Sequence, residues 1–145
     1  MVALDIKLLD PQLPAPAYAH EGDAALDIRS AIDGTLAPGE RMLVPCGFAI
    51  ALPEGYAALV LPRSGLAAKH GISIVNAPGL IDSGYRGEIK VALVNLDSDQ
   101  VFSFQRGDRI AQMMIIPVPP VTLRAVEDLP ESTRGTAGFG SSGLH

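Results

Sequence analysis

Residues 71–95 read GISIVNAPGLIDSGYRGEIKVALVN, and this stretch decides the fold. Its first five residues are rich in isoleucine and valine, which is typical of a short buried strand. From Glu88 to Val94 the larger aliphatic residues Ile89, Val91 and Leu93 fall on one face, with Glu88, Lys90 and Ala92 on the other, which is typical of a strand with one face in the core. Proline, glycine and other turn formers fill the interval. The pattern predicts a β-hairpin with a long, turn-rich connection.

Three side chains in this connection can take part in chemistry. Asn76 has an amide that donates and accepts hydrogen bonds, Asp82 has a carboxylate, and Tyr85 has a flat apolar face with a polar tip. Asp-Ser-Gly-Tyr is also an ordinary turn, in which the aspartate caps its own backbone. On this stretch alone the turn interpretation is favoured, so any functional role depends on the rest of the chain.

Composition predicts one domain of short strands. A chain of 145 residues is long enough to bury a core, and a hydrophobic content of 48% excludes a disordered protein. The 15 glycines and 12 prolines favour many turns over long helices. We find no repeat, no heptad pattern and no linker that would divide the chain.

Cysteine content and charge restrict the setting and the partners. The single Cys46 excludes an internal disulfide and a cysteine-based zinc site, and it fits a reducing, cytoplasmic setting. We expect no signal peptide, and no apolar run approaches the roughly 18 residues of a membrane span. The net charge of −5 argues against broad binding of nucleic acid. The net charge does not exclude the binding of a small anionic ligand at a place where a few arginines converge.

Short apolar segments predict roughly ten strands, which together indicate an all-β fold, a jelly-roll-like β-barrel or sandwich. The segment at 41–52 is one strand, or two strands bent around Pro45 and Gly47. Outside the hairpin, the other segments are 4–9, 24–32, 56–61, 100–104 and 109–118, with a last strand placed at 121–126.

One short helix is predicted at 64–70. Ser64 is a good N-cap, Lys69 and His70 suit the last turn, and Gly71 suits the C′ position. The preceding Arg63 gives this helix start the makings of an anion site, although simple capping with a solvated arginine explains it as well.

The C-terminal residues 133–145 read TRGTAGFGSSGLH and cannot build a core. Residues 138–143 match G-x-G-x-x-G, but no strand precedes them closely and no helix can follow, so they are not a dinucleotide fingerprint. The alternatives are a disordered tail, which the segment alone favours, and a flap that folds over phosphates with the help of Arg134.

Arginines stand beside glycine-containing turns: Arg63, Arg86, Arg109 and Arg134. This placement suits several loops that gather around one polyanion, and it also suits ordinary surface solubility. The tripeptide at 106–108, Arg-Gly-Asp, is interpreted as a turn that opens a strand.

Five ordered blocks together resemble the trimeric deoxyuridine triphosphatase (dUTPase) family. They are AALDIRSA (24–31), PRSGLA (62–67), NAPGLIDSGYRGEIKVAL (76–93), RGDRIAQM (106–113) and RGTAGFGSSG (134–143). The resemblance implies a jelly-roll core (1–132) with a glycine-rich flap (133–145), and a homotrimer with active sites at subunit interfaces. It implies Mg²⁺-dependent hydrolysis of dUTP to dUMP and pyrophosphate, which limits uracil entry into DNA and supplies dUMP for thymidylate synthesis.

The resemblance also implies residue roles. Asp82 would orient and activate the attacking water, and Tyr85 would pack on the deoxyribose. The residues expected to read uracil, or to lie near it, are Asn76, Leu80, Ile81 and Lys90.

The remaining implied roles concern the phosphates and the metal. Asp27 would support the Mg²⁺ region through water. The residues expected to hold phosphates from a neighbouring subunit are Arg63, Ser64, Gly65 and Gln112. The residues expected to close the flap are Arg134, Phe139, Gly140, Ser141 and Ser142, with Phe139 stacking on the base.

Two departures and two rivals accompany the resemblance. Ala25 stands where the family often has glycine, and residues 136–137 are Thr-Ala where an acidic residue and glycine are common.

A dCTP deaminase would share the trimer and the triphosphate grip, but the turn from Asp82 to Tyr85 favours hydrolysis. A non-enzymatic jelly-roll binding or assembly module would use Asp82 only as a turn residue.

Overall fold

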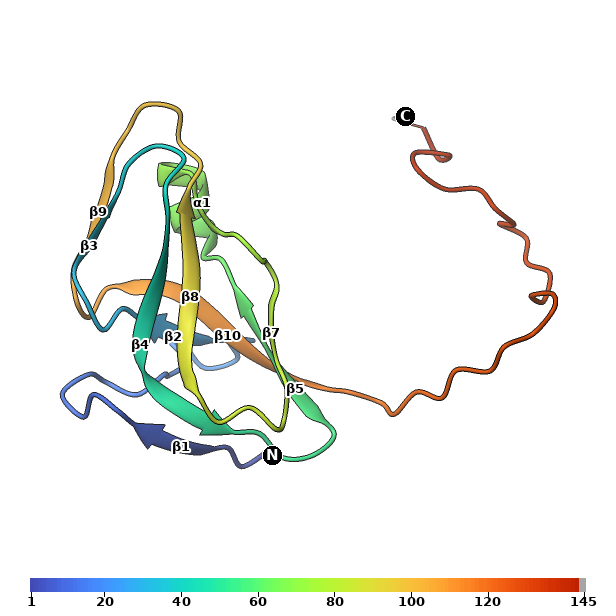
Figure 1. Ribbon diagram of the computed structural model, residues 1–145, viewed down its shortest axis with the longest axis horizontal. Coiled ribbons are helices and arrows are strands. Elements are labelled where there is room, and N and C mark those ends of the chain that lie inside the picture. Colours follow the sequence, from blue (N-terminus) through green and yellow to red (C-terminus); the bar gives the residue numbers. More distant parts are fainter. Residues whose placement is uncertain (144–145) are drawn as a thin grey trace.

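Two four-stranded antiparallel sheets form the body of the computed structural model, which describes residues 1–143 (Figure 1). Across the first sheet the order is β1 (Asp5–Leu8), β4 (Arg41–Ala51), β8 (Glu88–Asn95) and β6 (Ile72–Ile74). Across the second it is β2 (Leu26–Arg29), β10 (Arg109–Pro117), β5 (Tyr56–Leu61) and β7 (Gly79–Ile81). A ribbon pairs β3 (Gly34–Leu36) with β9 (Phe102–Phe104), and the one helix among residues 1–143 is α1 (Ser64–His70). The predicted all-β, jelly-roll-like class is confirmed.

The predicted hairpin forms, but its connection does more than turn. Strands β6 and β8 pair antiparallel, with Ile74 opposite Leu93. Between them, β7 leaves this sheet and pairs with β5, where Ile81 lies opposite Ala58. The stretch at 71–95 therefore contributes strands to both sheets. The sequence did not indicate β7, because its three residues stand among turn formers.

Strand β4 runs as one strand through the predicted bend. Its pairing with β8 shifts register between Pro45 and Ala49, and Gly47 has a φ of 75°, which favours glycine. The Gly47 amide donates to the Glu88 carboxylate at 3.1 Å. The Gly47 carbonyl accepts from the amides of Leu9 and Asp10 at 2.8 and 2.9 Å, which attaches the N-terminal loop to the bulge.

Apolar side chains from both sheets meet in one core. On β8 the alternation is as expected, with Ile89, Val91 and Leu93 buried. Each fully buried large aliphatic side chain stabilises the fold by about 1.5–3 kcal/mol before entropy is counted. Cys46 is also buried, and burial raises its pKa to about 12, so the thiol stays protonated and unreactive near neutral pH.

Two local predictions were wrong. The N-cap of α1 is Arg63, with φ −89° and ψ 127°, and no side chain caps the helix. Ser64 instead lies inside the first turn. Residues 121–126 form no strand, because the three nearby prolines direct the chain away from the sheet edges. Gly71 does end the helix, with φ 66°, and its amide donates to the carbonyls of Ala67 and Leu66.

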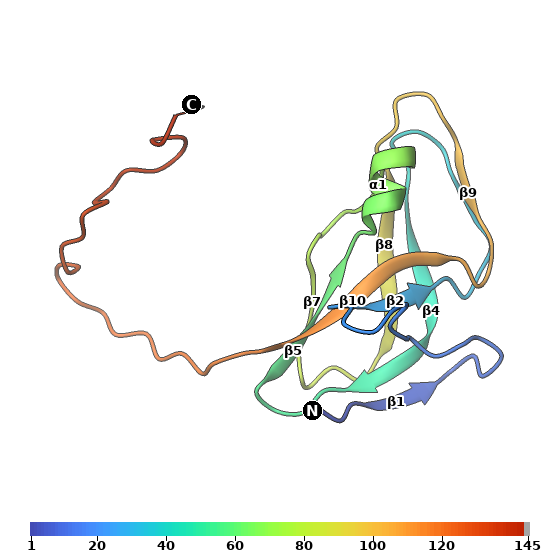
Figure 2. The same cartoon turned by 180° about the vertical axis from the view of Figure 1, so that it is seen from behind.

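The chain leaves the sandwich after Pro117 and runs as an extended arm (residues 118–143) away from both sheets (Figures 1 and 2). Apolar side chains on it are open to solvent, with Leu123 92% and Leu129 84% exposed. Among the described residues, no helix is long and apolar enough to cross a membrane.

Asn95 is a buried polar side chain at the end of β8, and it connects three segments. Its amide donates to the carbonyls of Leu36 and Gln100 at 3.0 and 2.8 Å, and its Oδ1 accepts from the Asp97 amide at 2.9 Å. An Asn95→Ala substitution would leave these groups without partners. We therefore expect the free energy of unfolding to fall by about 2 kcal/mol or more in urea denaturation at fixed protein concentration. The exposed Ser98→Ala is the control, and an equal effect of both would contradict this role.

Candidate functional site

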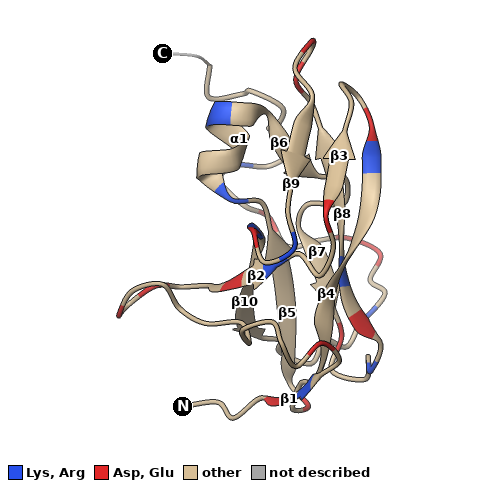
Figure 3. Ribbon diagram, turned by 90° about the vertical axis from the view of Figure 1, so that its left-hand side faces the viewer, with Lys and Arg blue, Asp and Glu red and all other residues tan. Residues whose placement is uncertain are grey.

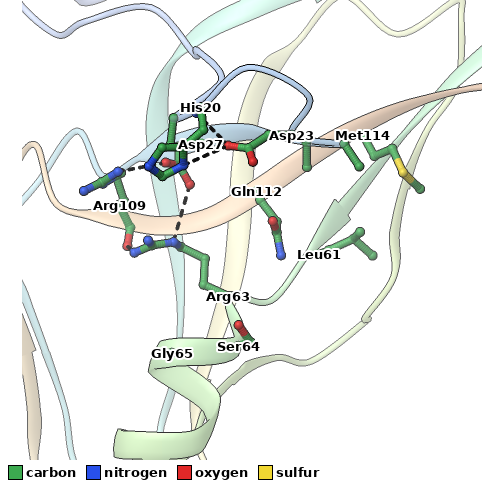
Figure 4. A pocket seen from close by; sticks show the side chains of 13 residues that line it. His20, Asp23, Asp27, Leu61, Arg63, Ser64, Gly65, Arg109, Gln112 and Met114 are labelled. Carbon is green, nitrogen blue, oxygen red and sulfur yellow. Dashed lines mark hydrogen bonds and ion pairs between the residues drawn. The ribbon is translucent and has the colours of Figure 1, made fainter.

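The larger of two candidate half-sites is a cavity of about 610 Å³ beside the start of α1 (Figure 4). Strands β2, β5 and β10 supply its floor, and the loop at 19–25 forms one rim. Its polar lining residues are His20, Asp23, Asp27, Arg63, Ser64, Arg109 and Gln112. All five residues that the resemblance assigns to the phosphates or to the metal line this cavity: Asp27, Arg63, Ser64, Gly65 and Gln112.

An acidic side chain between two arginines organises this cavity. Asp27 Oδ2 accepts from Arg109 Nη1 at 3.0 Å, and Asp27 Oδ1 lies 3.4 Å from Arg63 Nε. Arg63 also donates from Nη1 to the Arg109 carbonyl at 3.0 Å. The Asp27 side chain is 17% exposed, whereas those of Arg63 and Arg109 are 32% and 43% exposed. The carboxylate thus holds two arginine side chains that both line the cavity.

Strand register explains why these residues meet. Strand β10 lies between β2 and β5, so Gln112 faces Asp27 on one side and Leu61 on the other. Gln112 Nε2 donates to the Pro62 carbonyl at 2.8 Å, which fixes the segment that carries Arg63. Most of the ribbon of both sheets carries no charge (Figure 3). The charged residues of this cavity come from β2 (Asp27), from the start of β10 (Arg109), from the residue before α1 (Arg63) and from the loop at 19–25.

The smaller half-site is a cavity of about 80 Å³ between β7 and β8. It is much smaller than the first cavity, so it can take only a small group. Strand β7 has a strand partner on one side only, so backbone groups on its other edge can pair with a ligand. All four residues expected at the base line it: Asn76, Leu80, Ile81 and Lys90.

Asp82 and Tyr85 lie in the turn that follows β7 directly. The Tyr85 amide donates to the Asp82 carbonyl at 3.1 Å, and the Tyr85 hydroxyl donates to the Glu88 carbonyl at 3.0 Å. Arg86 donates from Nη1 to the carbonyls of Ser83 and Tyr85 at 2.6 and 2.9 Å. Arg86 therefore braces this turn and does not join the arginine-lined cavity. Asp82 is exposed and follows Ile81, a lining residue of the small half-site, directly in the chain, but it lines a separate cavity of about 340 Å³ next to the loop at 54–57.

Within one chain the expected site residues fall into three separate groups. Across the described residues, the two cavities share no lining residue. The arm carries the third group, and it runs away from both cavities (Figure 2). In the arm Arg134 donates from Nε to the Ala137 carbonyl at 2.8 Å, and Phe139 is fully exposed. Gly140, Ser141 and Ser142 lie in the adjoining exposed turns.

Sequence reasoning gave no specific role to three residues of the larger cavity. Arg109 completes the pair of guanidinium groups, and its place after the turn at 106–108 was the available signal. His20 and Asp23 stand at the rim, where Asp23 Oδ2 accepts from the His20 amide at 2.8 Å. The sequence alone did not indicate that His20 and Asp23 lie at this rim, because the loop that carries them has no periodic pattern.

Comparison with known proteins identifies close relatives. The family model described as dUTPase matches residues 12–143. The deoxyuridine 5'-triphosphate nucleotidohydrolase of Thermobifida fusca is 56% identical over 144 residues, 99% of this chain and 80% of that protein. The enzyme of the same name from Corynebacterium glutamicum is 52% identical, covering 99% and 96% of the two chains. A Staphylococcus bacteriophage 80alpha dUTPase mutant with dUpNHpp superposes with a TM-score of 0.91 at 31% identity, covering 98% and 99%.

We expect Arg63→Gln to weaken the binding of inorganic tripolyphosphate by about 10- to 100-fold in isothermal titration calorimetry. The substitution removes a charged donor and leaves the Asp27 carboxylate less compensated, so both changes oppose an anion. Arg41→Gln, an exposed arginine at the start of β4, is the matched control for total charge. Equal affinities of the two variants would exclude Arg63 from the anion site.

Proposed function

The chain belongs to the dUTPase family, and we propose that it hydrolyses dUTP to dUMP and pyrophosphate. The observation that carries this proposal is the position of the small half-site, which ends at Ile81, directly before Asp82. A base bound between β7 and β8 would bring its first phosphate toward that carboxylate. The same reaction would limit uracil entry into DNA and supply dUMP for thymidylate synthesis, in the cytoplasm.

Recognition of uracil rests on the edge of β7. A pyrimidine ring in the small half-site would pair with backbone groups around Leu80 and Ile81 and with the Asn76 amide. Cytosine reverses the donor and acceptor pattern on one edge of the ring, so these groups would stay unpaired. Such a mismatch can discriminate by roughly 10⁴-fold. The methyl group of thymine would meet the backbone that lines so small a cavity.

The triphosphate needs compensation of its charge before water can attack. Arg63 and Arg109 supply guanidinium donors that Asp27 already holds in place. Donors that need no reorganisation give electrostatic stabilisation, which is usually the largest single contribution to catalysis. Ser64, Gly65 and Gln112 complete the proposed phosphate grip.

Asp82 is proposed to orient one water molecule and to take its proton. The water oxygen would bond to the phosphorus nearest the nucleoside, and the bond from that phosphorus to the bridging oxygen would break. The bridging oxygen then leaves with pyrophosphate, while the new oxygen stays on dUMP. A positioned general base typically contributes 10²- to 10⁴-fold.

The separation of the half-sites supports a homotrimer with active sites between subunits. A single chain keeps Asp82 and the arginine-lined cavity apart, so one site would join the base half-site of one copy to the phosphate half-site of a neighbour. The arm, with Leu123 and Leu129 exposed, would cover apolar surface on another copy. Residues 134–142 would then close over the nucleotide.

Magnesium fits this proposal as an ion carried mainly by the substrate. Among the described residues, no group of three or more His, Cys, Asp or Glu side chains is arranged to hold a metal. Mg²⁺ commonly binds substrate phosphates and keeps several waters, and Asp27, which lines the larger cavity, would accept from such a water. When bound, the ion would neutralise charge on the phosphates. A phage phi11 dUTPase mutant is described with a structural Mg(II) ion.

Pyrophosphate release tests the activity itself. The chain is incubated with Mg²⁺ and with dUTP, dCTP, dTTP or UTP in parallel. We expect rapid release from dUTP alone. No release from any nucleotide would refute hydrolysis, and ammonia from dCTP would indicate a deaminase instead.

We expect Asp82→Asn to lower the turnover number by at least about 100-fold while the affinity for dUpNHpp changes little. The amide keeps the size of the side chain but cannot take a proton from water. Stopped-flow pyrophosphate detection measures turnover, and calorimetry measures binding. Asp99→Asn, on an exposed loop after β8, is the matched control. Turnover within tenfold of the parent would remove Asp82 from water activation.

We expect a chain that ends at Thr133 to lose most of its turnover and to keep the sandwich intact. No strand or core residue of the described chain lies beyond Pro117, so the core does not depend on the removed segment. Circular dichroism and the unfolding midpoint check the fold, and pyrophosphate release checks activity. Full turnover in this truncation would discard the flap.

A further inference from the structure

The Tyr85 ring folds back over the backbone of Gly87. A Cβ added at Gly87 would lie 2.6 Å from Tyr85 Cζ and 3.0 Å from Cε2, and it would also meet the hydroxyl oxygen. Carbon atoms in ordinary contact are about 3.5–4.0 Å apart, so any side chain at 87 would displace the ring by close to 1 Å. Glycine is therefore the residue that permits this ring position.

The ring is held at two points and is open on one side. Its hydroxyl end lies against Gly87, where only a glycine leaves room for Cζ and Cε2, and its hydroxyl donates to the Glu88 carbonyl at 3.0 Å. Tyr85 is nevertheless 46% exposed, so a large part of it remains free for a ligand. This arrangement presents a flat surface at a defined height above the turn.

The backbone itself does not demand glycine at this position. The φ of Gly87 is outside the left-handed region, in contrast to Gly71 or Gly107. The three atoms nearest to a Cβ at this position all belong to Tyr85. Gly84, which directly precedes Tyr85 in the same turn, also has a φ outside the left-handed region. A Cβ added at Gly84 would meet no atom within 4 Å.

The contact lies on the surface, so it contributes little to the fold. A comparable contact exists in the interior, where a Cβ at Gly34 would lie 2.7 Å from Phe104 Cε1. Phe104 is only 3% exposed, so its displacement would disturb the core. Tyr85 can move into solvent without such a cost, so the glycine at 87 fixes the position of the ring and contributes little to the stability of the fold.

We infer that Gly87 is a positioning residue for sugar selection, because it sets the height at which Tyr85 meets the deoxyribose. The inference rests on the proposed function, in which Tyr85 packs on that sugar. A ring seated on Gly87 leaves no room for the 2′-hydroxyl of UTP. A ring displaced by close to 1 Å would lose its hydrogen bond to Glu88 and would no longer enforce that exclusion.

The test compares Gly87→Ala with Gly84→Ala, the same substitution at a position where the added Cβ meets no atom within 4 Å. We expect Gly87→Ala to lower the ratio of kcat/KM for dUTP over UTP by about tenfold or more, toward the ratio of Tyr85→Ala. We expect Gly84→Ala to keep the parent ratio and both variants to keep the parent unfolding midpoint. In a Tyr85→Ala background, Gly87→Ala should change the ratio by less than twofold.

A second measurement follows the ring directly. With tyrosine-labelled protein, NMR should show the Tyr85 ring signals shifted in Gly87→Ala and unchanged in Gly84→Ala. Unshifted signals would overturn the inference, as would an equal loss of selectivity in the Tyr85→Ala background. Shifted signals with an unchanged ratio in both Gly87→Ala and Tyr85→Ala would uphold the positioning and refute the sugar role of Tyr85.

Discussion

Strand β8 is the constraint on which the rest of the structure depends. It pairs with β4 on one side and β6 on the other, and its inward face fills the centre of the core. Its last residue, Asn95, donates to the carbonyl of Leu36, the last residue of β3 in the β3–β9 ribbon. Because β8 cannot shift register without exposing three aliphatic side chains, the turn before it is held in place as well. The position of Asp82 and Tyr85 follows from that turn.

The second organising interaction is electrostatic. Asp27 sits between Arg63 and Arg109 and lies opposite Gln112 on the neighbouring strand. An exposed ion pair adds little stability, so the value of this arrangement lies in orientation. The carboxylate holds two guanidinium groups in one place, which lets both face the same cavity. The fold thus assembles a cationic grip from residues that are far apart in the chain.

Much of the architecture could be predicted from the sequence. Alternation along β8 and the turn chemistry around it were sufficient for the hairpin, and glycine at 71 was sufficient for the helix end. Strand β7 was not predictable, because three residues among turn formers gain their structure only from pairing with β5. The meeting of Arg109 with Asp27 depends on strand register, which local patterns do not encode. The requirement for glycine at 87 depends on one side chain folding back, so it is visible only in three dimensions.

The buried thiol has a practical consequence. Cys46 is the one cysteine of the chain, and it is both enclosed by the core and held in its protonated form. The folded surface therefore offers nothing to a maleimide dye at neutral pH. A cysteine engineered into the arm would be the sole labelling position, with no need for a cysteine-free background. A fluorophore attached there would report the motion of the arm against the sandwich in real time.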